Sequence, residues 1–60
     1  MAFYRQYENE ARYEQITEAE AIKKLQPNYN PDFNVVKWMK DNPGMQTLHT
    51  VSAWYWWDNE

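Results

Sequence analysis

The sequence predicts a small α+β domain in which an antiparallel sheet of two or three strands carries two short helices on one face. Runs of β-forming residues lie near both ends of the 60-residue chain, whereas helix start and stop signals fill its middle. Aromatic side chains, four of them tryptophan, replace much of the missing aliphatic content. Because each buried ring removes about 150–250 Å² from water, we expect a single domain, residues 1–60, with an aromatic core.

The N-terminal segment is rich in β-formers, and residues 2–8 predict a first strand. Residues 11–16 predict a second strand, joined to the first by a turn at 8–10. Apolar side chains four residues apart leave one alternative open, which is a single helix over residues 2–15.

The clearest helix signal begins at Thr17, in the sequence Thr-Glu-Ala-Glu. This is a capping box, in which Thr17 caps the amide of Glu20 and the Glu20 side chain caps back. The predicted helix covers residues 18–26 and ends at Pro27, since the residue before a proline disfavours helical geometry. Its short apolar face consists of Ala21, Ile22 and Leu25.

A second helix is predicted over residues 31–41, with Asn30 as its N-cap and Pro31 at its first position. The side chains expected to face the core are Val35, Val36 and Met39, with Phe33 or Trp38 at the margin. The neighbouring β-branched valines leave an alternative open, a hairpin with strands at 33–40 and 45–52 and a turn between them.

The C-terminal segment, residues 46–57, is predicted to form one long strand that pairs antiparallel with the first. Alternation places Val51, Ala53, Tyr55 and Trp57 on one face, together with Thr47 and His49, and places Leu48, Trp54 and Trp56 on the other. We expect the face with Val51, Tyr55 and Trp57 to pack under the helices, and the reversed assignment of the two faces is the open alternative. Two helices are enough to cover one face of such a sheet, so we expect the other face to be uncovered.

The residue types present in the sequence give little support for catalysis or metal binding. His49 is the one histidine, and strand alternation would place it on the face opposite Ser52, the one serine. The chain contains no cysteine and one glycine, which excludes the usual zinc patterns and a glycine-rich phosphate loop. We therefore expect no enzyme activity, no catalytic residue, no cofactor and no metal.

Charge and hydropathy limit the cellular compartments and the classes of partner that the sequence favours. Nine acidic and six basic residues give a net charge of -3, so a basic footprint for nucleic acid is missing. The sequence has no apolar run long enough to cross a membrane and no apolar signal core near its start. With no cysteine, these features favour a cytoplasmic protein.

The C-terminal aromatic run is the main candidate for function, because tryptophan and tyrosine are typical anchors of protein interfaces. The predicted protein-binding residues are Tyr4, Trp54, Tyr55, Trp56 and Trp57. A predicted acidic surface, suited to a basic groove on a target, consists of Glu8, Glu10, Glu14, Glu18 and Glu20. The alternative for these glutamates is an ordinary solvated face.

Together, these features predict a small acidic protein-interaction module, an inhibitor or adaptor that binds a larger protein and forms a homodimer. In size and charge alone, the chain resembles the small inhibitors that phages and other mobile elements make against host enzymes. Two alternatives are single-stranded nucleic-acid binding by aromatic stacking and a structural homo-oligomer.

Overall fold

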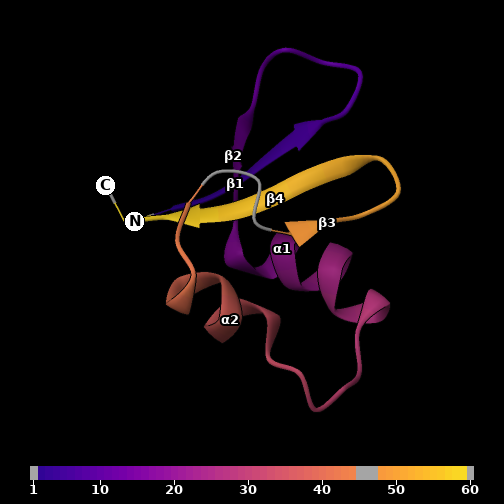
Figure 1. Ribbon diagram of the computed structural model, residues 1–60, viewed down its shortest axis with the longest axis vertical. Helices are drawn as coiled ribbons and strands as arrows, with labels where there is room; N and C mark the ends of the chain where they lie inside the picture. Colours follow the sequence, from indigo (N-terminus) through magenta and orange to yellow (C-terminus); the bar gives the residue numbers. More distant parts are fainter. Residues whose placement is uncertain (1, 45–47, 60) are drawn as a thin grey trace.

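A four-stranded antiparallel sheet forms one layer of the computed structural model, and two helices form the other (Figure 1). The structure describes residues 2–44 and 48–59. In chain order the elements are β1 (Ala2–Tyr7), β2 (Glu14–Ile16), α1 (Glu18–Leu25), a 3-10 turn η1 (Gln26–Asn28), α2 (Val35–Asp41), β3 (Leu48–His49) and β4 (Ala53–Asp58). The predicted fold class is confirmed, with a strand count slightly higher than expected and the order β2-β1-β4-β3.

The two terminal strands pair antiparallel at the centre of the sheet, as predicted, from Ala2 opposite Asp58 to Tyr7 opposite Ala53. β2 lies on the other side of β1 but begins only at Glu14, so the connection between these strands is longer than predicted. The alternative of one helix over residues 2–15 is wrong, because this segment satisfies its backbone groups by pairing across strands.

The predicted first helix is confirmed as α1. The hydroxyl of Thr17 accepts a hydrogen bond from the amide of Glu20 at 3.1 Å, which is the expected N-cap. The carboxylate of Glu20 lies 3.4 Å from the guanidinium of Arg5, so it also ties the helix to β1. α1 ends at Leu25, and Pro27 lies in the following 3-10 turn because proline has no amide hydrogen to continue the α-helix.

The second helix begins four residues later than predicted. The side chain of Asn30 accepts from the amide of Asp32 at 2.9 Å, which closes a local turn instead of starting a helix. Asn34 is the N-cap of α2, and its side chain accepts from the amide of Lys37 at 3.0 Å. Both asparagines satisfy a nearby amide, so the local sequence alone does not say which one starts the helix. The alternative hairpin with a strand at 33–40 is wrong.

The predicted long C-terminal strand is interrupted by a turn between β3 and β4. The amide of Thr50 donates to the carbonyl of Ala53 at 2.8 Å, and Val51 at the tip is 94% exposed. This reversal places Leu48 opposite Tyr55, so Leu48 is buried on the helix side of the sheet and not beside the outward tryptophans. The prediction that Val51 faces the core is wrong for the same reason, and residues 46–47 lie outside the described residues.

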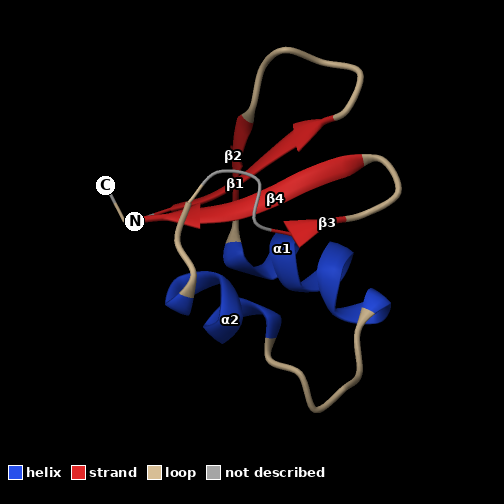
Figure 2. Cartoon of the chain, viewed as in Figure 1, coloured by secondary structure: helices blue, strands red, loops and turns tan. Residues whose placement is uncertain are grey.

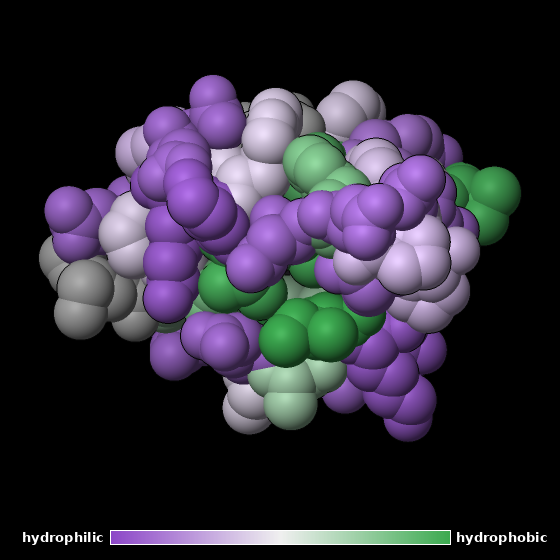
Figure 3. Space-filling model, turned by 90° about the horizontal axis from the view of Figure 1, so that it is seen from below, coloured by the Kyte–Doolittle hydropathy of each residue, from purple (hydrophilic) through white to green (hydrophobic). Residues whose placement is uncertain are grey.

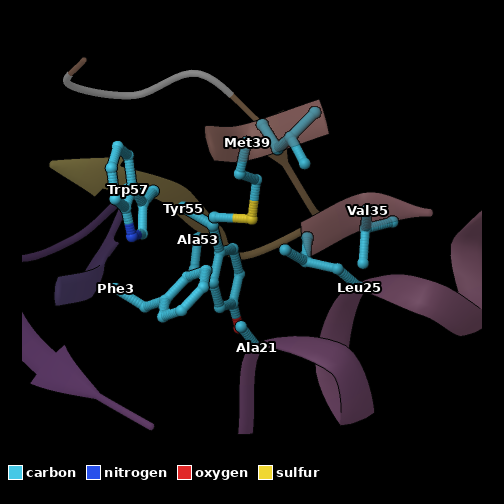
Figure 4. Close-up of a cluster of buried hydrophobic side chains, with 9 residues drawn as sticks. Phe3, Ala21, Leu25, Val35, Met39, Ala53, Tyr55 and Trp57 are labelled. Atoms are coloured by element: carbon cyan, nitrogen blue, oxygen red, sulfur yellow. The ribbon is translucent and has the colours of Figure 1, made fainter. Parts of the chain in front are cut away.

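The core fills the space between the sheet and the helices (Figures 2 and 4). Alternation along β4 places Ala53, Tyr55 and Trp57 under the helices, as predicted. The buried cluster consists of Phe3, Ala21, Leu25, Val35, Met39, Leu48, Ala53, Tyr55 and Trp57. Both helices lie on one face of the sheet, which confirms the predicted arrangement and leaves the opposite face without a helical layer.

Candidate functional site

The face of the sheet that points away from the helices, called the outer face below, carries aromatic residues from its two central strands. Tyr4 lies opposite Trp56, and Gln6 lies opposite Trp54, in the pairing of β1 with β4. Because side chains alternate along a strand, these four residues share one face. Trp54 and Trp56 therefore point away from the helices, as the sequence predicted.

Trp56 is nevertheless 2% exposed, which corrects the expectation of an uncovered tryptophan pair. Its ring stacks on Tyr4 at 5.7 Å between centroids and meets Tyr13 edge-on at 5.5 Å. Tyr4 and Tyr13 also contact each other edge-on at 5.4 Å. We call these three residues the ring cluster. Its third member comes from the loop between β1 and β2, which folds back over the sheet.

Hydrogen bonds hold this loop against the outer face. The amide of Glu10 donates to the carbonyl of Tyr7 at 3.1 Å, and the side chain of Gln6 donates to the carbonyl of Glu10 at 3.0 Å. Tyr13 is still 58% exposed, so the ring that covers Trp56 offers much of its own surface to solvent. Sequence reasoning missed Tyr13, whose only signal was a large aromatic residue within an otherwise polar, charged segment.

Trp54 occupies the other end of the outer face and is partly exposed. Its ring packs against His49 of β3 at 4.1 Å between centroids. The Nε2 atom of His49 contacts the carboxylate of Glu8, and the amide of Glu8 donates to the carbonyl of Ser52 at 3.0 Å. These contacts connect the loop after β1 to the hairpin of β3 and β4, beside the Trp54 ring.

The five predicted protein-binding residues are divided between the two faces. Tyr55 and Trp57 belong to the core, where they are 3% and 8% exposed, so a partner cannot reach their rings while the domain is folded. Tyr4, Trp54 and Trp56 lie on the outer face, but Trp56 is buried by the rings of Tyr4 and Tyr13. Accessible ring surface on this face is therefore supplied by Tyr4, Trp54 and Tyr13.

The five predicted acidic residues do not form one continuous free surface. Arg5 pairs with Glu14 at 2.9 Å and also reaches Glu20, while Lys40 lies 3.7 Å from Glu18. Glu8 contacts His49. Among the described residues, the carboxylate of Glu10 alone of the five has no ion-pair partner. Residues 8–20 therefore do not present a row of free carboxylates that could imitate the phosphates of a nucleic acid.

Arg5 acts as a structural cation on the helix side of the sheet. Burial of its guanidinium lowers the pKa, but hydrogen bonds to Glu14 and Tyr55 outweigh this effect and hold the pKa of Arg5 above its ordinary value. The guanidinium also lies 5.0 Å from the centroid of the Tyr7 ring. Arg5 thus joins β1 to β2 and α1, and it neutralises carboxylates that would otherwise be free.

The distribution of charge differs between the two sides of the domain. All four lysines, Lys23, Lys24, Lys37 and Lys40, belong to the helices, which also carry or adjoin an equal number of acidic residues. The connection between β1 and β2 and the outer side of β4 carry three carboxylates, those of Glu8, Glu10 and Asp58, and one permanent cation, Arg12. The surplus negative charge of the described residues therefore lies on the sheet side.

A second surface lies on the helix side, where apolar area is bordered by hydrophilic residues (Figure 3). Ile22 of α1 is 40% exposed there. A shallow hollow of about 260 Å³ lies beside α2, next to Phe33 and Trp38. A second hollow, of about 370 Å³, lies elsewhere, between Glu8 and the turn at Ser52. Both are open to solvent, and neither collects the buried titratable groups that acid–base catalysis requires.

Two further observations concern potential metal ligands and helix length within residues 2–44 and 48–59. No three potential ligands among histidine, aspartate and glutamate come together in this part of the chain. Neither helix has the length and apolar character needed to cross a bilayer. Comparison of the chain with protein-family models, with curated proteins and with solved structures finds no match.

Proposed function

We propose that this chain is a small protein-interaction module, an inhibitor or adaptor, whose outer face binds a larger protein. The observation that carries the proposal is the ring of Tyr13, which is 58% exposed yet held in place by two aromatic neighbours. A ring fixed before binding loses little conformational freedom in a complex, which is why such residues are effective interface anchors. Tyr4 and Trp54 extend this surface along the sheet.

The arrangement of charge favours a protein partner over single-stranded nucleic acid. A strand stacked on the outer rings needs cations beside them to hold its phosphates. The lysines lie on the helices, across the sheet from Trp54, and Arg12 is the one permanent cation of the connection between β1 and β2 that carries Tyr13. Carboxylates near the rings would repel a phosphate backbone.

Site-specific photo-crosslinking provides the first step of a test. A photoreactive phenylalanine analogue at position 13 should capture a partner that the same group at position 29, on the helix side, does not capture. The captured protein is then purified, and its affinity is measured with Tyr13→Ala and Trp54→Ala. Each should weaken binding at least tenfold, as expected for central interface anchors.

Ile22→Ala is the control, because Ile22 is exposed on the opposite side of the domain. It should leave the affinity within about twofold of the parent protein. Unchanged affinity in both Tyr13→Ala and Trp54→Ala, with a folded domain, would exclude the outer face as the interface.

Self-association is a separate prediction, favoured by the sheet edges. β2 and β3 each pair on one side only, so their other edges offer backbone groups to a second copy. Both strands are short, at three and two residues, which limits such pairing. Light scattering over a concentration series distinguishes the two cases: a dimer that persists in Tyr13→Ala would assign the contact to an edge and not to the outer face.

A further inference from the structure

The outer face combines open aromatic surface with carboxylates that the chain leaves incompletely neutralised. Tyr13 is more than half exposed, and Glu10, three residues before it, has no ion-pair partner among the described residues. Trp54 lies beside His49, which contacts the carboxylate of Glu8. Ring faces attract cations, and nearby carboxylates add to this attraction.

The same chain already shows how a ring and a carboxylate hold an arginine. On the inner side of the sheet, the guanidinium of Arg5 lies 5.0 Å from the centre of the Tyr7 ring and bonds to the carboxylate of Glu14 at 2.9 Å. Tyr13 and Glu10 carry the same two chemical groups on the connection that the Gln6 side chain holds to β1, and no ion pair of the described residues includes Glu10. Arg12, between them in sequence, has no ion-pair partner among the described residues.

We propose that the segment of the partner that docks on the outer face is cationic and is anchored by an arginine beside Tyr13 and Glu10. This inference rests on the proposed function and specifies the chemistry of the partner. Arginine fits better than lysine because its planar guanidinium is weakly hydrated, stacks on aromatic rings and presents paired donors to a carboxylate. An acidic segment would be repelled by the surplus negative charge on this side of the domain.

The test is a titration of isotope-labelled protein, followed by NMR, with three blocked peptides of equal length. One alternates glycine with arginine, the second replaces arginine with lysine, and the third replaces it with glutamate. The arginine peptide should shift the resonances of Tyr13, Glu10 and the Trp54 indole, and it should bind at least about threefold more tightly than the lysine peptide. Signals from Trp38, on the helix side, should not move.

Two variants and one control assign the effect to specific groups. Glu10→Gln should weaken binding of the arginine peptide about threefold, and Tyr13→Leu should remove the preference for arginine over lysine. Asp32→Asn is the matched control, because Asp32 is an exposed carboxylate on the helix side, and it should leave the affinity unchanged. Should Tyr13→Leu disturb the fold, Glu10→Gln still tests the proposal.

Three outcomes would overturn this inference: equal binding of the lysine peptide, shifts confined to the helices, or an unchanged affinity in Glu10→Gln. Any of them, together with a partner captured from position 13, would reject the inference of an arginine anchor and would leave the proposed function supported. Capture from position 29 alone would instead overturn the proposed interface, whatever the peptides do.

Discussion

The two faces of one sheet bury tryptophan and tyrosine in different ways. On the inner face, Tyr55 and Trp57 lie under two N-capped helices, of which α1 is tied to β1 by the Arg5–Glu20 ion pair. On the outer face, Trp56 is equally buried, but its described ring contacts are with a cross-strand neighbour and a single loop residue, Tyr13. Complete burial of a ring therefore does not require a second layer. A cover of this kind keeps its own outer surface available to a partner.

The largest expected effect lies in the helical cover of the inner face. Leu25 is 0% exposed, so Leu25→Ala should lower the free energy of unfolding by about 2–5 kcal/mol, the range for a buried leucine that leaves a cavity. A domain of this size has about 3–9 kcal/mol in total, so much of the population should unfold. Urea unfolding followed by circular dichroism measures the loss. Ile22→Ala, on the exposed side of the same helix, should cost less than about 1 kcal/mol, and an equal loss in both variants would contradict the assigned core.

Arg5 forms ion pairs with β2 and α1 at the inner face, and its replacement should cause the second-largest loss of stability. Arg5→Met keeps a long apolar side chain but leaves Glu14 and Glu20 without their cation, and it should cost about 1–2 kcal/mol because both carboxylates are partly exposed. The pKa of Arg5 is raised above its ordinary value, so its contribution is fully present below that ordinary value and is lost only as the pH rises through the folded pKa. The difference from the parent protein should therefore stay constant between about pH 6 and 10. A difference that disappears within this range would show that another group carries the effect.

Removal of the outer cover should lower stability by no more than the loss of Arg5 does, and it should have a clear spectroscopic signature. Tyr13→Ala removes two edge-on ring contacts and should cost about 1–2 kcal/mol while exposing Trp56. The indole proton of Trp56 should then exchange faster with solvent, while that of Trp57 should not change. Tyr13→Phe retains the ring and is the control. Slow exchange at Trp56 in the alanine variant would mean that Tyr13 is not its cover.

The start of α2 decides how much helix covers the inner face, and the two asparagines before it can be compared directly. Asn34→Ala removes the N-cap and should lower the free energy of unfolding by about 1 kcal/mol. Asn30→Ala removes only a local turn bond to Asp32 and should cost less than about 0.5 kcal/mol. Parallel urea titrations measure both. A larger loss in Asn30→Ala would place the start of the helix where the sequence alone suggested.

The smallest effect is expected where the chain belongs to neither face. Val51 is 94% exposed at the tip of the hairpin between β3 and β4, so Val51→Ser should change stability by less than about 0.5 kcal/mol. Thermal unfolding is a sufficient measurement. A loss of about 1 kcal/mol or more would show that Val51 packs against the domain, as strand alternation first suggested.

Local chemistry accounts for the parts of the fold that could be predicted from the sequence. The cap formed by Thr17 and Glu20 marks the start of α1, because it depends on residues three positions apart. Alternation along β4 is a property of the strand itself, so the placement of Tyr55 and Trp57 on the face opposite Trp54 could be read in advance, whereas packing decided which of the two faces meets the helices. The same reasoning identified Tyr4 and Trp54 as candidate contacts on the outer face.

Only the tertiary structure decided which aromatic side chains remain accessible. Tyr13 covers Trp56 because a loop folds across the sheet, and Arg5 neutralises Glu14 and Glu20 from another strand. These contacts join residues 9 to 43 positions apart along the chain, so no local pattern records them. Propensity and periodicity report how a segment orders its own backbone, whereas burial and charge pairing depend on which segments meet. The sequence by itself therefore determined α1 and the alternation of side chains along β4. Contacts between distant segments decided where α2 begins, where the chain reverses before β4 and which side chains a partner can reach.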